Sequence, residues 1–178
     1  MKDTRPFRFS TFTTPLGPFS VAVDPEGAVA AAVFGARAAL RARLKGGRLV
    51  GDRAATAAAR MQLAQWFRGA RRGFSLALAP AGTPFQRRVW GALSGIPYGQ
   101  TRSYGDISRA LGSSPRAVGR ANATNPVCVI VPCHRVIGSD GALTGYAFGE
   151  RRKLGLLRLE GRAAVSPGAP CARPRRRP

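Results

Sequence analysis

Short runs of apolar and β-branched residues, separated by turn residues, occupy the first part of the chain. Residues 8–14 and 18–23 flank a Leu-Gly-Pro turn and predict two strands. The turn sequence DPEG leads into a third apolar run, residues 28–35, which predicts a third strand. Residues 36–55 are rich in Ala, Arg and Gly and predict no definite element, and residues 74–80 favour one more strand.

Apolar residues at helical spacing first occur at residues 55–70, and most of the elements predicted after residue 83 are helices. Residues 55–70 predict a helix. Its apolar face is expected to contain Met61, Leu63, Trp66 and Phe67. Further on, Thr83 is followed by Pro84 and Gln86, which is the pattern of a capped helix start. The apolar residues of this next helix keep helical spacing: Phe85, Val89, Trp90, Leu93 and Ile96.

Two short helices are predicted next, each with its own start signal. Ser103 and Asp106, three residues apart, begin the first, and a Ser-Pro pair begins the second, over residues 115–123. Two short helices joined by a tight turn have the outline of a helix-turn-helix, whose second helix can enter a DNA groove. Many other helical hairpins share this outline, so the pattern alone does not assign DNA binding.

The apolar run 127–131 (VCVIV) predicts a buried extended segment because it is rich in β-branched residues. Pro132 cannot continue a strand ladder, so Cys133 is expected where a buried strand leads into a turn. Residues 138–146 predict a loop or hairpin, and residues 150–161 predict a short helix ended by a glycine.

The length and hydropathy bound the class of protein. A chain of 178 residues with 44% hydrophobic residues fits one domain of ordinary size or two small ones. The first residues contain no apolar signal-peptide core, and no apolar stretch approaches the roughly 20 residues of a membrane span. We therefore expect a soluble, cytoplasmic protein with no membrane partner.

Charge adds a candidate partner. The net charge is +21, with only eight acidic residues against 29 basic ones. The excess of Arg and Ala is partly what GC-rich coding produces, but such coding does not deplete acids. A chain this basic attracts polyanions, and nucleic acid is the default partner. A basic protein without a specific anionic partner is the alternative.

The cysteines indicate chemistry rather than a scaffold. Cys128, Cys133 and Cys171 form no regular disulfide framework, and one histidine without a CxxC pair leaves too few ligands for a zinc site. We expect no metal. Cys133 precedes the single histidine, His134. A reactive cysteine needs its pKa lowered, yet adjacent side chains do not face each other in a helix or strand, so contact requires a bend or a water molecule.

A histidine that acts as a base also benefits from a carboxylate that orients it. The second half of the chain has only four acids, and Glu160, at the end of the last predicted helix, could return to the site. A structural cysteine beside a chance histidine remains the alternative on these residues alone.

Several blocks resemble one known family. The segment IVPCHRVIG (130–138) resembles the active-site signature of the O6-alkylguanine-DNA alkyltransferases, which repair DNA by direct reversal. Residues 83–108, 116–126 and 143–161 resemble further family blocks, in family order and spacing. The resemblance is strong over residues 80–161, and before them only the general layout is similar. The chain is identified as a bacterial-type member.

The resemblance implies an α/β fold in two parts. Residues 1–79 would form a small ribonuclease-H-like α/β domain. Residues 80–162 would form a mostly helical, winged-helix-like domain with a helix-turn-helix, and residues 163–178 a disordered basic tail. The implied activity is that of a methylated-DNA–protein-cysteine methyltransferase. After base flipping, an alkyl group would move once from O6-alkylguanine in double-stranded DNA to Cys133. The resemblance implies a monomer that needs no cofactor and no obligate protein partner. O4-alkylthymine stays open as a second substrate.

The resemblance also implies residue roles at the reacting centre. Cys133 would be the alkyl acceptor, and His134, through a water molecule, would form with Glu160 the relay that leaves the cysteine as a thiolate. Asn125 would brace the turn that holds this segment. Tyr104 would give its phenolic proton toward guanine N3. Without the family context, Tyr104 could be a core tyrosine and Glu160 could only neutralise a nearby arginine.

Further residues would contact the DNA and the base. Arg116 would fill the space of the flipped nucleotide, although it could also be one more solvated arginine, and Ala117 would let its helix approach the minor groove. Ser103 and Arg120 are further candidate DNA contacts. In the candidate pocket, the backbone groups of Cys133 and Val136 and the amide of Ala147 would read the guanine edge. Tyr146 would pack against the base. Phe148 and Lys153 are the remaining candidate pocket residues.

Two other function classes remain in view. A lesion-binding protein of the alkyltransferase-like kind carries another residue, commonly tryptophan, at the cysteine position, so Cys133 argues against it. A cysteine hydrolase would need an oxyanion hole, for which the sequence shows no motif. Phe148 stands where many members have glycine, which leaves the size of the accepted alkyl group open.

Overall fold

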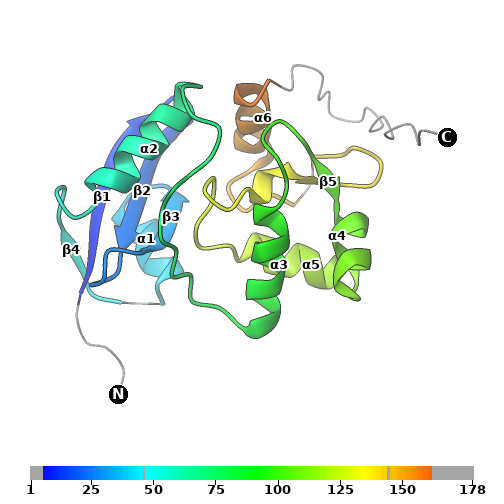
Figure 1. Ribbon diagram of the computed structural model, residues 1–178, viewed down its shortest axis with the longest axis horizontal. Helices are drawn as coiled ribbons and strands as arrows, with labels where there is room; N and C mark the ends of the chain where they lie inside the picture. The colour runs from blue at the N-terminus through cyan, green and yellow to red at the C-terminus, as the bar shows by residue number, and fades with distance from the viewer. Residues whose placement is uncertain (1–5, 46, 144, 162–178) are drawn as a thin grey trace.

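A four-stranded sheet forms the N-terminal half of the protein, at the left of Figure 1. The computed structural model describes residues 6–45, 47–143 and 145–161. The strand order is β3-β2-β1-β4, with β1 antiparallel to β2, β2 antiparallel to β3, and β4 parallel to β1. The strands are β1 (Phe7–Thr14), β2 (Gly17–Val23), β3 (Val29–Phe34) and β4 (Leu49–Gly51).

One helix covers each face of this sheet (Figure 1). Alternation along β2 decides which residue meets which helix, because successive side chains of a strand point to opposite faces. Phe19 and Val21 belong to the cluster that includes α2 (Ala57–Phe67), whereas Ala22 packs in the cluster that includes Leu40 of α1 (Arg37–Arg43). The sheet is therefore buried on both faces.

The first three predicted strands and the predicted helix over 55–70 are confirmed, with two corrections nearby. Met61 is 54% exposed, because it lies about 200° around the helix from Leu63 and so points away from the core. Residues 74–80 form no strand. Only Leu78 makes an isolated bridge, to Val29, before the chain turns away at Pro80, which lacks a backbone donor.

Residues 36–55, for which the sequence predicts no element, contain α1 and β4. Neither has a strong local signal. Helix α1 has no side-chain cap at its start and only one fully buried residue, Leu40. Strand β4 has three residues and depends on pairing with β1. Both elements are formed by contact with the sheet rather than by local preference.

The C-terminal half is mostly helical and lies at the right of Figure 1. Its elements are α3 (Pro84–Ser94), β5 (Arg102–Ser103), α4 (Tyr104–Leu111), α5 (Pro115–Ala123), the short 3-10 helix η1 (Cys133–Arg135), β6 (Val136–Ile137) and α6 (Glu150–Leu159). The predicted starts of α3 and α4 are confirmed as capping boxes, made by Thr83 with Gln86 and by Ser103 with Asp106.

The expected extended strand over 127–131 is wrong, although the segment is buried as predicted apart from the half-buried Ile130. Its start pairs with β3, since the amide of Cys128 donates to the carbonyl of Ala32. Val129 then adopts a positive φ of 73°, and the Val131 amide donates back to the Val127 carbonyl, which closes a turn. A left-handed conformation is unusual for a β-branched residue, so this turn is held by its surroundings.

The two halves share one hydrophobic core. The largest cluster combines Phe19, Phe34 and Trp66 of the first half with Val89, Trp90 and Val127 of the second. None of the helices within the described residues is long and apolar enough to span a bilayer. The predicted basic tail, with Cys171, lies outside the described residues.

The two tryptophans give a matched test of what places α5. Trp90 donates its indole N–H to the Ala121 carbonyl of α5 over 2.9 Å, whereas the equally buried indole N–H of Trp66 has no hydrogen-bond partner among the described residues. Trp90→Phe should therefore lower the free energy of unfolding by about 1–2 kcal/mol more than Trp66→Phe does. Denaturant unfolding of both variants measures the difference. Equal losses would mean that the bond to α5 contributes nothing.

Candidate active site around Cys133

Cys133 opens the 3-10 helix η1 and is only 3% exposed. Asn125 braces the turn in front of it on both sides. Its Nδ2 donates to the Val131 carbonyl over 2.9 Å, and its Oδ1 accepts from the Val127 amide over 3.0 Å. The Asn125 side chain thus supplies the hydrogen bonds that a neighbouring strand would otherwise make.

His134 and Glu160 lie together in the interior. His134 Nε2 is 2.9 Å from Glu160 Oε1, and both side chains are fully buried. An ionised carboxylate only accepts hydrogen bonds, so Nε2 must carry the hydrogen. The Nδ1 atom is buried, has no hydrogen-bond partner among the described residues and presents its lone pair. Burial lowers the pKa of His134, against the opposing effect of Glu160, so the ring is a neutral base.

Arg135 completes this cluster, and the sequence interpretation did not include it. Its guanidinium donates to Glu160 Oε1 over 2.7 Å and to the Ile96 carbonyl over 2.6 Å. Burial alone would raise the pKa of Glu160, but the hydrogen bonds from His134 and Arg135, with the charge of the Arg135 guanidinium, bring it down to about 2. The carboxylate is therefore ionised at every physiological pH.

Burial raises the pKa of the Cys133 thiol. A hydrogen bond with Asn125 and the charge of Lys153 oppose this effect without overcoming it. Lys153 itself is fully buried, which lowers its pKa to about 8 despite the opposing charges of Cys133 and Glu150. The thiol form of Cys133 therefore dominates at neutral pH.

Tyr104, at the start of α4, lies beside these groups. Burial and the nearby Cys133 raise the pKa of its phenol, while a hydrogen bond from Asn122 acts to lower it. Asn122 Nδ2 lies 3.4 Å from the Tyr104 hydroxyl and 3.4 Å from the Cys133 carbonyl. Lys153 Nζ is 5.9 Å from the centroid of the Tyr104 ring. Asn122 carries no motif signal of its own and was not predicted.

The remaining predicted pocket residues differ in burial. Tyr146 is nearly buried, and its ring centroid lies 5.6 Å from that of the half-buried Phe148. Ala147 between them is exposed. Val136 is fully buried, because its side chain belongs to the main hydrophobic core, and its backbone pairs with Arg102 of β5.

Residues of the N-terminal half pack against Phe148. The ring of Phe148 packs 5.7 Å from that of Phe34, and the Arg43 guanidinium lies 5.5 Å from its centroid. Arg43 also donates to the Ala123 carbonyl of α5 over 3.0 Å. The sequence interpretation missed Arg43, because it falls in the stretch with no predicted element.

The candidate DNA contacts lie on the surface of α4 and α5. Arg116 and Arg120 are exposed and one helical turn apart, and Ala117 is half-buried. The Ser103 hydroxyl is already engaged in the cap of α4, where it accepts from the Asp106 amide over 3.0 Å and donates to its carboxylate over 2.8 Å.

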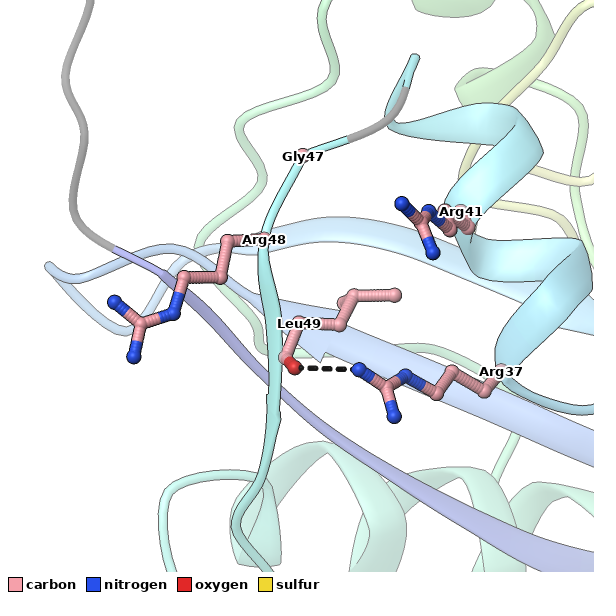
Figure 2. Close-up of a pocket in the computed structure, with 5 residues that line it drawn as sticks. All are labelled: Arg37, Arg41, Gly47, Arg48 and Leu49. Atoms are coloured by element: carbon pink, nitrogen blue, oxygen red, sulfur yellow. Dashed lines mark hydrogen bonds between the residues drawn. The ribbon is translucent and has the colours of Figure 1, made fainter.

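A separate hollow of about 230 Å³ lies on the N-terminal half (Figure 2). Arg37 and Arg41 reach it from α1, and Arg37 donates to the Leu49 carbonyl over 3.1 Å. None of the predicted site residues lines it. Within the described ranges, no three His, Cys, Asp or Glu side chains gather as a metal site would require.

Comparisons with known proteins identify the family. A family model described as "6-O-methylguanine DNA methyltransferase, DNA binding domain" matches residues 84–162. A methylated-DNA–protein-cysteine methyltransferase of Mycobacterium leprae is 52% identical over 111 residues, which are 61% of this chain and 67% of that protein. The chain belongs to the O6-methylguanine-DNA methyltransferase family.

Other members of this methyltransferase family extend the match. The enzyme of the same name from Methanosarcina acetivorans is 55% identical over 102 residues, or 56% of this chain. The match covers 65% of its length, just under two thirds. A crystal structure of Mycobacterium tuberculosis OGT in complex with DNA is 39% identical with a TM-score of 0.76, covering 90% of this chain and 95% of that one. The mixed α/β fold is therefore that of the family.

The Glu160 cluster predicts how stability depends on pH. The pKa of Glu160 is depressed from its ordinary 4.5 to about 2 in the folded protein, so its contribution is complete above about pH 5 and disappears as the pH falls toward 2. This contribution is about 3 kcal/mol. Glu160→Gln should therefore be much less stable than the parent at pH 7, and the gap should close in acid.

Unfolding free energies from denaturant titrations at several pH values measure this gap. Glu150→Gln, which removes an exposed carboxylate from the same helix, is the matched control and should change stability little at any pH. A gap between parent and Glu160→Gln that stays constant down to pH 2 would contradict the ionised cluster.

Proposed function

We propose that this protein repairs DNA by transferring an alkyl group from O6 of guanine to Sγ of Cys133. The observation that carries the proposal is the buried Cys133 in a braced turn, followed by His134 on an ionised Glu160, in a chain of this methyltransferase family. Such a cluster combines a potential nucleophile with a neutral base that is held in one tautomer.

The reaction begins with removal of the thiol proton of Cys133 by His134 Nδ1, through a water molecule. The thiolate attacks the alkyl carbon while the bond from that carbon to O6 breaks, and the electron pair passes to the guanine. Tyr104 donates its phenolic proton to N3, so the base leaves neutral. The thioether sulfur is a poor leaving group, so the alkyl group stays on Cys133 and each protein molecule acts once.

The substrate is double-stranded DNA that contains O6-alkylguanine. The base has to leave the stack before the alkyl carbon can be attacked in line. We further propose that α4 and α5 act as a helix-turn-helix in a winged-helix-like domain over residues 80–162, and that residues 1–79 are the ribonuclease-H-like part. The exposed Arg116 enters the stack, Ala117 lets α5 approach the minor groove, and Arg120 contacts phosphate. Ser103 is a further proposed DNA contact, although its amide and its hydroxyl both already donate to the Asp106 carboxylate.

The pocket reads the flipped base. The exposed segment at Ala147 offers its amide to the guanine edge, together with backbone groups of Cys133 and Val136, and Tyr146 packs against the ring. Phe148 and Lys153 complete the wall. The protein acts as a monomer without a cofactor, in the cytoplasm, where a free thiol stays reduced.

Intact mass after incubation with duplex O6-methylguanine DNA tests the reaction. One added methyl group per protein, mapped to Cys133, is expected, and repair should stop at one lesion per molecule. Cys133→Ala should gain no methyl group, whereas Cys128→Ala, which removes the other buried thiol, should still gain one. An unchanged mass would favour a lesion-binding protein, and repair beyond one lesion per molecule would exclude the single-use reaction.

Arg116 should matter for duplex DNA but not for the chemistry. Unstacking a base costs a few kcal/mol, and an inserted side chain that blocks its return offsets part of this cost. Arg116→Ala should slow transfer from duplex DNA by about tenfold to a hundredfold, which is roughly 1–3 kcal/mol. Its rate with the free base O6-benzylguanine should stay near that of the parent, if the pocket beside Phe148 admits the benzyl group.

Arg120→Ala, one turn along the same exposed face, is the matched control for the loss of charge. A similar loss for Arg120→Ala on duplex DNA alone would assign the effect to general phosphate attraction. Equal slowing of Arg116→Ala on both substrates would assign it to the pocket or the fold.

A further inference from the structure

Asn122 lies at the point where the proposed DNA-reading helix meets the reacting groups. It belongs to α5, is 2% exposed, and its amide nitrogen contacts both the Tyr104 hydroxyl and the Cys133 carbonyl at 3.4 Å. The amide group has two N–H donors, so a single nitrogen can serve both oxygens. Asn122 therefore joins α5, α4 and η1 through one side chain.

The chemistry of the partners determines which way this amide faces. The Cys133 carbonyl can only accept a hydrogen bond, so the opposite amide orientation would set two acceptor oxygens against each other. The nitrogen must therefore point toward the carbonyl and the phenol. Asn122 Oδ1 is also buried, and it has no hydrogen-bond partner within the described part of the chain.

The same donor determines what Tyr104 can do. A phenol oxygen that accepts from Asn122 directs its own proton to a different group. The phenol is also confined sterically, because a Cβ atom on Gly145 would lie 2.8 Å from the Tyr104 hydroxyl, and one on Gly119 would lie 3.9 Å from the ring. The oxygen of Tyr104 is thus held between α5 and the segment that carries Tyr146.

We propose that Asn122 is a positioning residue that holds Tyr104 as the proton donor to the departing guanine. This inference rests on the proposed function. The S–C bond forms as the C–O6 bond breaks, the electron pair enters the guanine ring, and N3 takes the phenolic proton. The Asn122 N–H then stabilises the phenolate, because a hydrogen bond to a charged oxygen is stronger than one to a neutral oxygen. The proton that Cys133 released through His134 and water returns to the phenolate.

Electrostatics agrees with this role. Burial and Cys133 raise the pKa of Tyr104, and the hydrogen bond from Asn122 is the influence that lowers it. Without Asn122, the phenol would be a weaker acid in a site that already disfavours its charged form. Asn122 also lies on the same helix as Arg116, so the donor to Tyr104 and the proposed intercalating side chain belong to one element.

Single-turnover rates with two duplex substrates test this role. Asn122→Leu keeps the branched outline of the side chain and removes the donor, so it should slow transfer from O6-methylguanine by about tenfold to a hundredfold. The second substrate is O6-methyl-3-deazaguanine, in which a C–H group replaces N3 and no proton can be accepted there. On this substrate Asn122→Leu should match the parent within about twofold. Equal slowing on both substrates would overturn the inference and assign Asn122 to the fold or to the Cys133 carbonyl.

Two further variants separate positioning from stability. Asn122→Leu combined with Tyr104→Phe should be no slower than Tyr104→Phe alone, because residues that act as one unit are not additive. Asn122→Asp keeps the shape but replaces the donor with an acceptor that captures the phenolic proton, so it should be at least as slow as Asn122→Leu. Fully additive losses, or an Asn122→Asp variant as fast as the parent, would overturn the inference.

The outcome for the parent protein separates this inference from the proposed function. Absence of methyl transfer from O6-methylguanine to Cys133 in the parent would contradict the proposed function itself. Transfer in the parent at the same rate as in Asn122→Leu would support the proposed function and contradict only the role of Asn122.

Discussion

The hydrogen bonds to the carboxylate of Glu160 are the interaction on which the rest of the site depends. It receives hydrogen bonds from His134 and Arg135 of η1 and from the amide of Gly99, so a single charge joins the end of α6 to two other segments. A buried charge without partners would be very costly, whereas one with this many donors is stable. The direction of the His134 ring, and hence which nitrogen can take a proton, follows from this arrangement.

The N-terminal half contributes to the site through packing. The Trp66 ring lies 5.9 Å from the His134 ring, and Phe34 packs against Phe148. Arg43 touches both the Phe148 ring and the end of α5. The buried environment that raises the pKa of Cys133 and lowers that of His134 is therefore built from both halves of the chain.

Local signals in the sequence predicted local structure well. The caps at Thr83 and Ser103 were predicted because each involves residues only three apart, and the first three strands were predicted from short apolar runs between turns. Elements that depend on distant partners were missed or wrong. Strand β4 exists through pairing with β1, and the turn at Val129 exists through the Asn125 side chain and β3.

The same distinction applies to the site. The family blocks pointed to Cys133, His134 and Glu160, and the structure brings His134 and Glu160 into contact. The sequence suggested a cysteine that rests as a thiolate, whereas burial favours the thiol, and burial cannot be read from a motif. Arg135, Asn122 and Arg43 lie in motifs or segments where nothing distinguishes them from their neighbours until the fold places their partners.

The contacts of Phe148 have a consequence for modularity. Phe148 packs against Phe34 and lies beside the guanidinium of Arg43, and both of these residues are more than a hundred positions earlier in the chain. A chimera that joined residues 80–161 to the N-terminal half of another family member would keep Cys133, His134 and Glu160, but it would lose the packing of Trp66 against the His134 ring. It would not inherit the support beneath Phe148. The surroundings of His134 and those of Phe148 therefore both depend on how the two halves are paired.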